Sequence, residues 1–228
     1  MRETVIRFSF SLTRHLFLFL APEKCTKSAD IAFIMDSSER IGIDNYQIQK
    51  DFIKAIAGSF DIRPSGSRAG VVISGNDTTM NIKFSDHLHE EDFKEAVDNL
   101  PYTQGKARLD HALRVALSQL LGAQGGARPG LSKILIVVSS ALKAQTGDDD
   151  LLGVSAKKLR QLGVTVFVMG VGDQVDAKVL SSLVTEEENV FLEESFESLM
   201  MKTRQVAKSA CDSAGLLLFL SYMHLTIF

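Results

Sequence analysis

The stretch from Ala29 to Arg40, which reads ADIAFIMDSSER, constrains the fold of this chain more than any other feature. Its apolar residues are continuous from 31 to 35, which is typical of a strand buried on both faces of a parallel sheet. Asp36 then opens a run of polar residues. In open α/β sheets, ligands bind beyond the carboxyl ends of the strands, so the carboxylate and hydroxyls here raise the question of a metal ion.

The remainder of the chain alternates short apolar runs with amphipathic segments. An Asn-Asp turn at residues 76 and 77 separates two neighbouring strand patterns, which predicts one hairpin. We therefore predict an α/β fold with a doubly wound, mostly parallel six-stranded sheet, one antiparallel edge strand and helices on both faces. The further strands are expected at 68–74, 78–84, 133–138, 164–168 and 189–192, and the helices at 44–60 (with Asp44 as N-cap), 89–100, 107–121, 150–162, 177–184 and 195–210.

Composition excludes several classes of function. The formal net charge is −3, with acidic and basic residues interspersed, and Trp is absent, so neither a basic patch nor stacking aromatics indicate a nucleic-acid partner. The Gly-x-Gly at residues 170–172 follows a strand but lacks the third glycine of a nucleotide-binding loop, which favours a turn. No serine lies in a Gly-x-Ser-x-Gly elbow. We therefore expect no enzyme, no catalytic residue and no small-molecule substrate.

The two cysteines, Cys25 and Cys211, bracket nearly every periodic segment of the chain. In a fold of this kind the two ends can lie close together, which favours a disulfide bond between them. Such a bond would close a very long loop and add on the order of 4–5 kcal/mol in the chain-entropy account. The alternative is two unrelated buried thiols, as in many cytosolic proteins.

The ends of the chain differ from its centre. Residues 1–27 are interpreted as a signal or leader segment with a linker, although the apolar run is short, and the sequon at Asn76 is a glycosylation site if the chain is secreted. Residues 212–228 form an apolar tail, whose final stretch of about 14 residues is short of the ~20 needed to span a bilayer. A truncated membrane segment, a lipid-anchor signal and a non-homologous end remain open; we favour the last and expect no membrane association.

Residues 28–211 resemble a von Willebrand factor type A domain, and most closely those of collagen VI-type chains and matrilins. The segments that carry this resemblance are ADIAFIMDSSERIG, SRAGVVISG, ARPGLSKILIVVSSA, LRQLGVTVFVMGVGD and VFLEESFESL. The resemblance implies a central sheet flanked by helices, with a metal-ion-dependent adhesion site at the edge where the strands end. In the family that site uses an Asp and two Ser of the first loop, a Thr, and a second Asp.

The family's five metal-binding positions are only partly retained. Asp36 and Ser38 match, whereas the second Ser falls on Arg40, the Thr on Ala107 and the second Asp on Ser140. Magnesium prefers octahedral oxygen coordination that includes carboxylates, and a guanidinium near the ion repels it. We therefore expect a degenerate site, limited to Asp36, Ser38 and Ser140, that is without magnesium or any other cofactor.

Taken with the resemblance, these features predict a secreted extracellular matrix or adhesion module. It would bind matrix or cell-surface proteins, such as collagens, without a metal ion. The expected contact surface is the edge around Asp36, Arg40, Ala107 and Ser140 with the nearby acidic residues Asp148 and Asp149, or else a helix face. The acidic run itself is read first as a helix cap. The alternatives are a magnesium-dependent adhesion domain, an intracellular scaffold domain of the same type, and a small hydrolase on a similar sheet.

Overall fold

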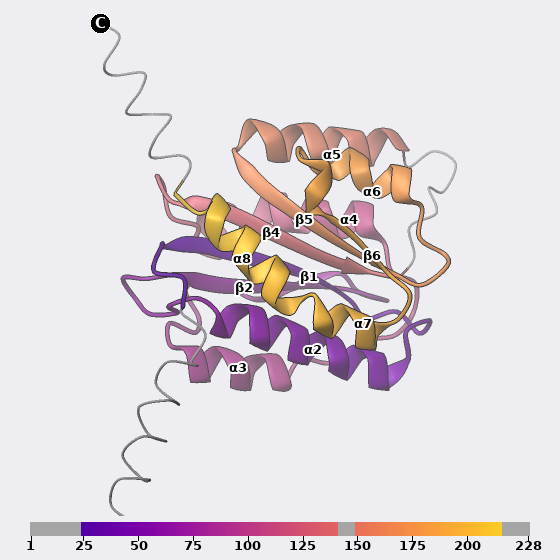
Figure 1. Ribbon diagram of the computed structural model, residues 1–228, viewed down its shortest axis with the longest axis horizontal. Coiled ribbons are helices and arrows are strands. Elements are labelled where there is room, and N and C mark those ends of the chain that lie inside the picture. The colour runs from indigo at the N-terminus through magenta and orange to yellow at the C-terminus, as the bar shows by residue number, and fades with distance from the viewer. Residues whose placement is uncertain (1–23, 141–148, 216–228) are drawn as a thin grey trace, which may run out of the picture.

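A computed structural model describes residues 24–140 and 149–215 of the chain. One six-stranded sheet, in the order β3-β2-β1-β4-β5-β6, lies between two layers of helices (Figure 1). The strands are β1 (Ala29–Asp36), β2 (Arg68–Ser74), β3 (Thr79–Ile82), β4 (Ser132–Ser139), β5 (Val164–Val171) and β6 (Val190–Glu193). The helices are α2 (Gly42–Gly58), α3 (Glu90–Asp98), α4 (Leu109–Val115), α5 (Asp149–Gln161), α6 (Ala177–Leu183), α7 (Phe196–Met201) and α8 (Thr203–Ser213).

Strand β1 is central and organises the two cores. It pairs in parallel with β2 on one side and with β4 on the other, and all eight of its residues are buried. Because side chains alternate along a strand, Ile31, Phe33 and Met35 enter one core while Ala32 and Ile34 enter the other. The continuous apolar run therefore reflects burial on both faces, as the sequence predicts.

The helices divide between the two faces. Side chains of α2, α3, α7 and α8 pack in the core that contains Phe33, and those of α4, α5 and α6 pack in the core that contains Ile34. Among the strands of the described residues, β3 alone runs antiparallel, as the hairpin partner of β2. The predicted fold class, with one antiparallel edge strand, is confirmed. Within the described residues, no helix combines the length and apolar character that crossing a bilayer requires.

Several predicted helix ends are wrong. Helix α2 begins at Gly42, which has a φ of 74°, so Asp44 lies in the first turn rather than at the N-cap. The helix predicted over 107–121 is two elements, because α4 continues as the π-helical turn η1 (Ala116–Leu120). The single helix predicted over 195–210 is α7 and α8, which meet at Lys202. None of these changes moves a strand.

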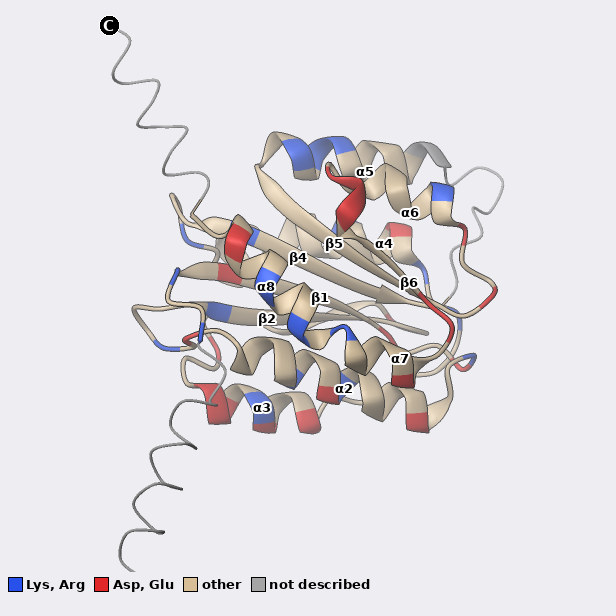
Figure 2. Ribbon diagram, in the orientation of Figure 1, with Lys and Arg blue, Asp and Glu red and all other residues tan. Residues whose placement is uncertain are grey.

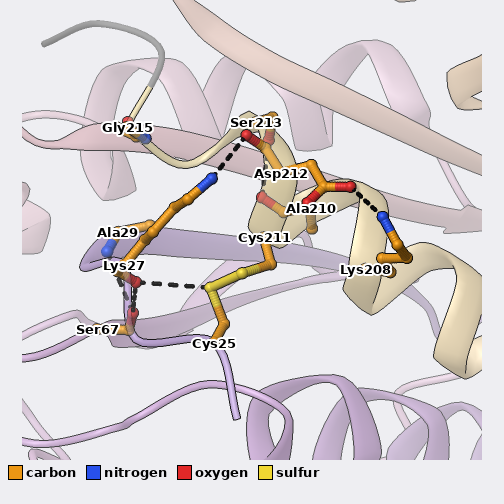
Figure 3. The surroundings of a disulfide bond; sticks show 11 residues. Cys25, Lys27, Ala29, Ser67, Lys208, Ala210, Cys211, Asp212, Ser213 and Gly215 are labelled. Carbon is orange, nitrogen blue, oxygen red and sulfur yellow. Dashed lines mark hydrogen bonds and ion pairs between the residues drawn. A yellow bond between two sulfur atoms is a disulfide. The ribbon is translucent and has the colours of Figure 1, made fainter. Parts of the chain in front are cut away.

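A disulfide bond joins Cys25 to Cys211 across 186 positions of sequence (Figure 3). It fastens the segment that enters β1 to the last turns of α8, as the first of the two cysteine interpretations predicts. Two hydrogen bonds support the same junction: Lys27 Nζ donates to the Asp212 carbonyl at 3.1 Å, and the Gly215 N–H donates to Ser132 Oγ at 2.8 Å. Residues 1–23 of the leader and linker predicted over 1–27, and the part of the apolar tail beyond residue 215, lie outside the described residues.

We predict that Cys25→Ser/Cys211→Ser lowers the free energy of unfolding by about 2–5 kcal/mol, because the cross-link restricts the unfolded chain over a very long loop. Urea unfolding followed by circular dichroism measures this difference. The reduced wild-type chain is the matched control and should unfold like the double variant. Equal midpoints for the oxidised wild type and the double variant would contradict the prediction.

Candidate functional site

The candidate site lies where the parallel strands end, at what we call the carboxyl edge: residues 36–40, 74–76, 102–108 and 139–140. Asp36, the last residue of β1, is only 1% exposed. The buried Gln49 of α2 fixes its backbone, accepting from the Asp36 N–H at 3.0 Å and donating to the Asp36 carbonyl at 2.8 Å. A helix on one face of the sheet thus sets the position of the acidic residue.

The Asp36 carboxylate is held by neutral donors. Its Oδ1 accepts the Ser38 N–H at 2.9 Å, and its Oδ2 accepts both the Ser140 N–H at 3.0 Å and the Ser140 hydroxyl at 2.8 Å. Hydrogen bonds to a charged acceptor are the stronger kind, and they replace the water that burial removes. The first loop (residues 37–40, directly after β1) and the end of β4 are therefore joined through the side chain of Asp36.

A second set of hydrogen bonds joins the first loop to the segment after α3. Ser37 Oγ accepts from the Thr103 N–H at 2.7 Å and from the Thr103 hydroxyl at 3.1 Å, and the Tyr102 hydroxyl donates to the Ser38 carbonyl at 2.9 Å. Beneath them, burial raises the pKa of Tyr46, and a hydrogen bond with Ser37 only partly opposes that shift. The Tyr46 phenol stays neutral and donates to the Pro101 carbonyl at 2.8 Å.

The backbone of this segment is tightly turned. Gln104 and Gly105 both have positive φ, of 59° and 72°. Their carbonyls accept the Asn76 N–H at 2.7 Å and the Glu39 N–H at 3.0 Å, respectively. A non-glycine residue in this region is strained unless its surroundings hold it there. The loop after β2, the first loop and the 102–108 segment thus form one hydrogen-bonded unit.

The other predicted site residues differ in their exposure and in what their side chains can offer a ligand. Ala107 is half-buried at the carboxyl edge and offers no polar side-chain atom. Arg40 is exposed and, within residues 24–140 and 149–215, pairs with neither Asp36 nor any other carboxylate. Asn76 is exposed on the loop after β2. Asp148 lies outside the described residues; α5 begins at Asp149, whose side chain is likewise not described.

These donors do not fit the metal ion that the family resemblance implies. Ser140 Oγ directs its proton to Asp36, and Ala107 supplies nothing. Ser38 Oγ is buried without a hydrogen-bond partner and is the one free hydroxyl of the set. Nowhere in the described part of the chain do three or more His, Cys, Asp or Glu side chains form a group that could hold a metal. One carboxylate and one free hydroxyl are fewer protein ligands than the family's site provides, so water would have to complete most of an octahedral shell.

Sequence reasoning missed two residues that build the site. The sequence pattern could have identified Gln49, because it is a polar residue in the inward stripe of α2, three positions after Tyr46. No such pattern marks Thr103, since its role depends on how the loop folds back onto Ser37. Both position the first loop rather than offering a donor to a ligand.

Comparison with known proteins agrees with this architecture. The sequence model of the von Willebrand factor type A domain matches residues 30–205. Human matrilin-1 is 24% identical over 188 residues, which are 82% of this chain and 37% of matrilin-1. The mouse collagen alpha-4(VI) chain is 26% identical over 194 residues, 85% of this chain and 8% of the collagen. The chain thus spans well under half of either relative.

A solved structure has the same fold. Proximal thread matrix protein 1 from the mussel byssus superposes with a TM-score of 0.76 and 27% identity, over 84% of this chain and 49% of that one. A further structure of the byssus protein, with a zinc-occupied metal-ion-dependent adhesion site motif, superposes with a TM-score of 0.74 and 27% identity, over 82% of this chain and 47% of that one. The same fold therefore carries a metal at this motif in a relative.

We predict that Ser140→Ala destabilises the fold by about 1–3 kcal/mol, because Asp36 loses its hydroxyl donor and stays buried. The matched control is Ser38→Ala, which removes a buried hydroxyl with no partner and should leave stability unchanged or slightly higher. Chemical denaturation at neutral pH measures both. Equal losses in the two variants would show that the bond to Asp36 contributes nothing specific.

Proposed function

Because the chain belongs to the von Willebrand factor type A domain family, we propose that it is an extracellular matrix or adhesion module that binds protein partners without a metal ion. The matrix proteins among its relatives, matrilin-1 and a collagen VI chain, support a role in binding rather than catalysis. The chain covers only part of these relatives, so the choice of partner is inferred from the family resemblance. The partners that we propose are collagens or other matrix and cell-surface proteins.

Metal independence is supported by the hydrogen bonds that the carboxylate of Asp36 already accepts. Its two carboxylate oxygens already accept three hydrogen bonds from Ser38 and Ser140. A cation at Oδ2 would have to compete with the two Ser140 donors, and Ala107 offers no ligand atom in their place.

The contact surface that we propose is the carboxyl edge around Asp36, Arg40, Ala107 and Ser140, together with the segment at 148–149. Asp36 is buried and acts by holding the loops, so direct contact falls to the exposed residues. Arg40 is the exposed cation of this set and lacks an ion-pair partner among the described residues. It suits a carboxylate on the partner, which Arg binds through paired hydrogen bonds.

A metal-dependent adhesion domain is the second candidate. Two observations favour it: the unpartnered hydroxyl of Ser38 points to a missing neighbour, and the byssus protein holds zinc at the corresponding motif. The two candidates differ in whether an ion is needed, so one set of measurements separates them.

We predict that calorimetric titration of the purified chain with Mg²⁺, Mn²⁺ or Zn²⁺ gives no binding at micromolar affinity. The triple variant Arg40→Ser/Ala107→Thr/Ser140→Asp, which restores the family's donor set, should gain binding that Asp36→Ala abolishes. Micromolar binding by the wild-type chain that Asp36→Ala removes would overturn metal independence and favour the second candidate.

The same proposal predicts that binding to a collagen-coated surface is insensitive to EDTA and weakened about tenfold or more by Arg40→Glu, because a charge reversal in a polar contact repels the partner. The control is Arg204→Glu, which reverses an exposed cation on α8. Equal effects of the two variants would place the contact elsewhere than the carboxyl edge.

We also propose that the chain is secreted. The disulfide bond supports an oxidising compartment, and the exposed sequon at Asn76 is accessible to glycosylation. Mass spectrometry of the protein from the culture medium, without reduction, is expected to find the Cys25–Cys211 bond and a glycan on Asn76. Reduced cysteines in an unglycosylated native protein would favour the intracellular scaffold instead.

A further inference from the structure

A small groove runs between α4 and α5, on the face opposite α2. Its apolar lining is Leu117, Leu151 and Val154, and its volume is about 160 Å³, enough for one aliphatic side chain. Leu151 is 44% exposed and Val154 58%, although most apolar residues of this domain are buried. The two lie three positions apart on α5, so they present one continuous apolar strip to solvent.

The rim of this groove is basic. Arg114 and Lys158 line it, and the side chain of Arg114 is 60% exposed. The buried Asp110 is the carboxylate in the groove and interacts with two cations, Arg108 at 3.0 Å and Arg114 at 3.8 Å, so it neutralises only part of their charge. Lys158 has no ion-pair partner in the described parts of the chain. Figure 2 shows the basic residues gathered on the C-terminal half of α5.

The complementary feature lies on the edge strand β6. Leu192 is 53% exposed, and β6 has a neighbour on one side only within the described sheet. Exposed glutamates flank the strand at 186–188 before it and at Glu194 after it, whereas Glu193 pairs with Lys202 at 3.6 Å. Red residues on both sides of β6 mark these acidic segments in Figure 2. An apolar side chain between unpaired carboxylates is what the basic groove would accommodate.

We propose that the groove between α4 and α5 binds the β6 edge of a second copy of this chain, with Leu192 inserted between Val154 and Leu117. The glutamates at 186–188 then lie against Arg114 and Lys158, and each surface covers apolar area that is otherwise in water. The two surfaces lie on different parts of the molecule, one over a helix pair and one at the end of the sheet (Figure 1). The contact is therefore heterologous, from groove to edge.

A second copy is favoured over an unrelated partner because the chain itself carries both halves of the contact. Each half combines an exposed apolar side chain with charges of one sign, and the two signs are opposite. The groove and the β6 edge use residues other than Asp36, Arg40, Ala107 and Ser140, so variants that test this contact differ from those that test the proposed binding function.

The first test is sedimentation velocity of the purified chain over a wide range of concentration, at about 50 mM and about 500 mM NaCl. Ion pairs between exposed groups are screened within a few Å at high salt. We expect concentration-dependent association that is stronger at the lower salt concentration. A monomer at every concentration in both buffers would overturn the proposal.

Single variants test which surfaces are used. Val154→Asp puts a carboxylate into the groove, and Lys158→Glu reverses a charge at its rim; each should weaken association about tenfold or more. Leu162→Asp is the matched control, since Leu162 is 48% exposed and follows α5 but lies outside the groove. All these residues are exposed, so thermal melts should confirm intact folding. Equal association by Val154→Asp and Leu162→Asp would contradict the proposal.

Mixing variants tests the direction of the contact. Glu187→Lys/Glu188→Lys on the edge and Val154→Asp/Lys158→Glu at the groove should each fail to associate alone. Their mixture should associate, because the first keeps a native groove and the second a native edge. A mixture that stays monomeric would overturn the proposal. So would a groove that binds another acidic protein in a Val154-dependent manner while copies of this chain do not bind one another.

Discussion

The whole structure depends on the burial of β1 on both faces. A charged side chain on a strand that is buried on both faces needs a hydrogen-bonding or charged partner. Strand β1 carries an aspartate near each end. At its start, Asp30 is fully buried and accepts from Arg128 through the backbone N–H at 2.6 Å and through Nε at 2.8 Å. An unpaired buried carboxylate would destabilise the fold by several kcal/mol. The segment before β4 is thus held beneath the beginning of β1 by charge as well as by packing.

At its other end, β1 meets the same requirement without a cation. Asp36 is as deeply buried as Asp30, and its partners are a backbone N–H of the first loop and the N–H and hydroxyl of Ser140. Where the family has a second aspartate, the two carboxylates would repel one another unless an ion lay between them. A serine at that position removes the repulsion and supplies a donor. The substitution therefore accounts for a carboxyl edge whose loops are joined by hydrogen bonds between protein groups.

The sequence predicted the strands well because their signal is local: continuous apolar runs such as Lys133 to Val138 have few other interpretations. It predicted helix ends poorly, since a positive φ at Gly42 and the π-helical turn after α4 depend on tertiary packing. At the site, motif positions identified Asp36 and Ser140, but no periodicity could reveal that Thr103 binds Ser37. That contact joins segments 66 positions apart and exists only once the loop has folded.

Buried charges and exposed charges follow different logic in this domain. Asp30, Asp36 and Asp110 all have named partners, because leaving them unpaired would oppose folding. Lys158 and the glutamates before β6 are in water, where folding requires nothing of them, so their arrangement beside exposed Val154 and Leu192 needs another reason. A groove-to-edge contact leaves one groove and one edge free at the ends of an assembly, and it extends unless its rotation closes a ring. In such an assembly, weak contacts from successive copies to a repetitive matrix partner would reinforce one another through effective concentration.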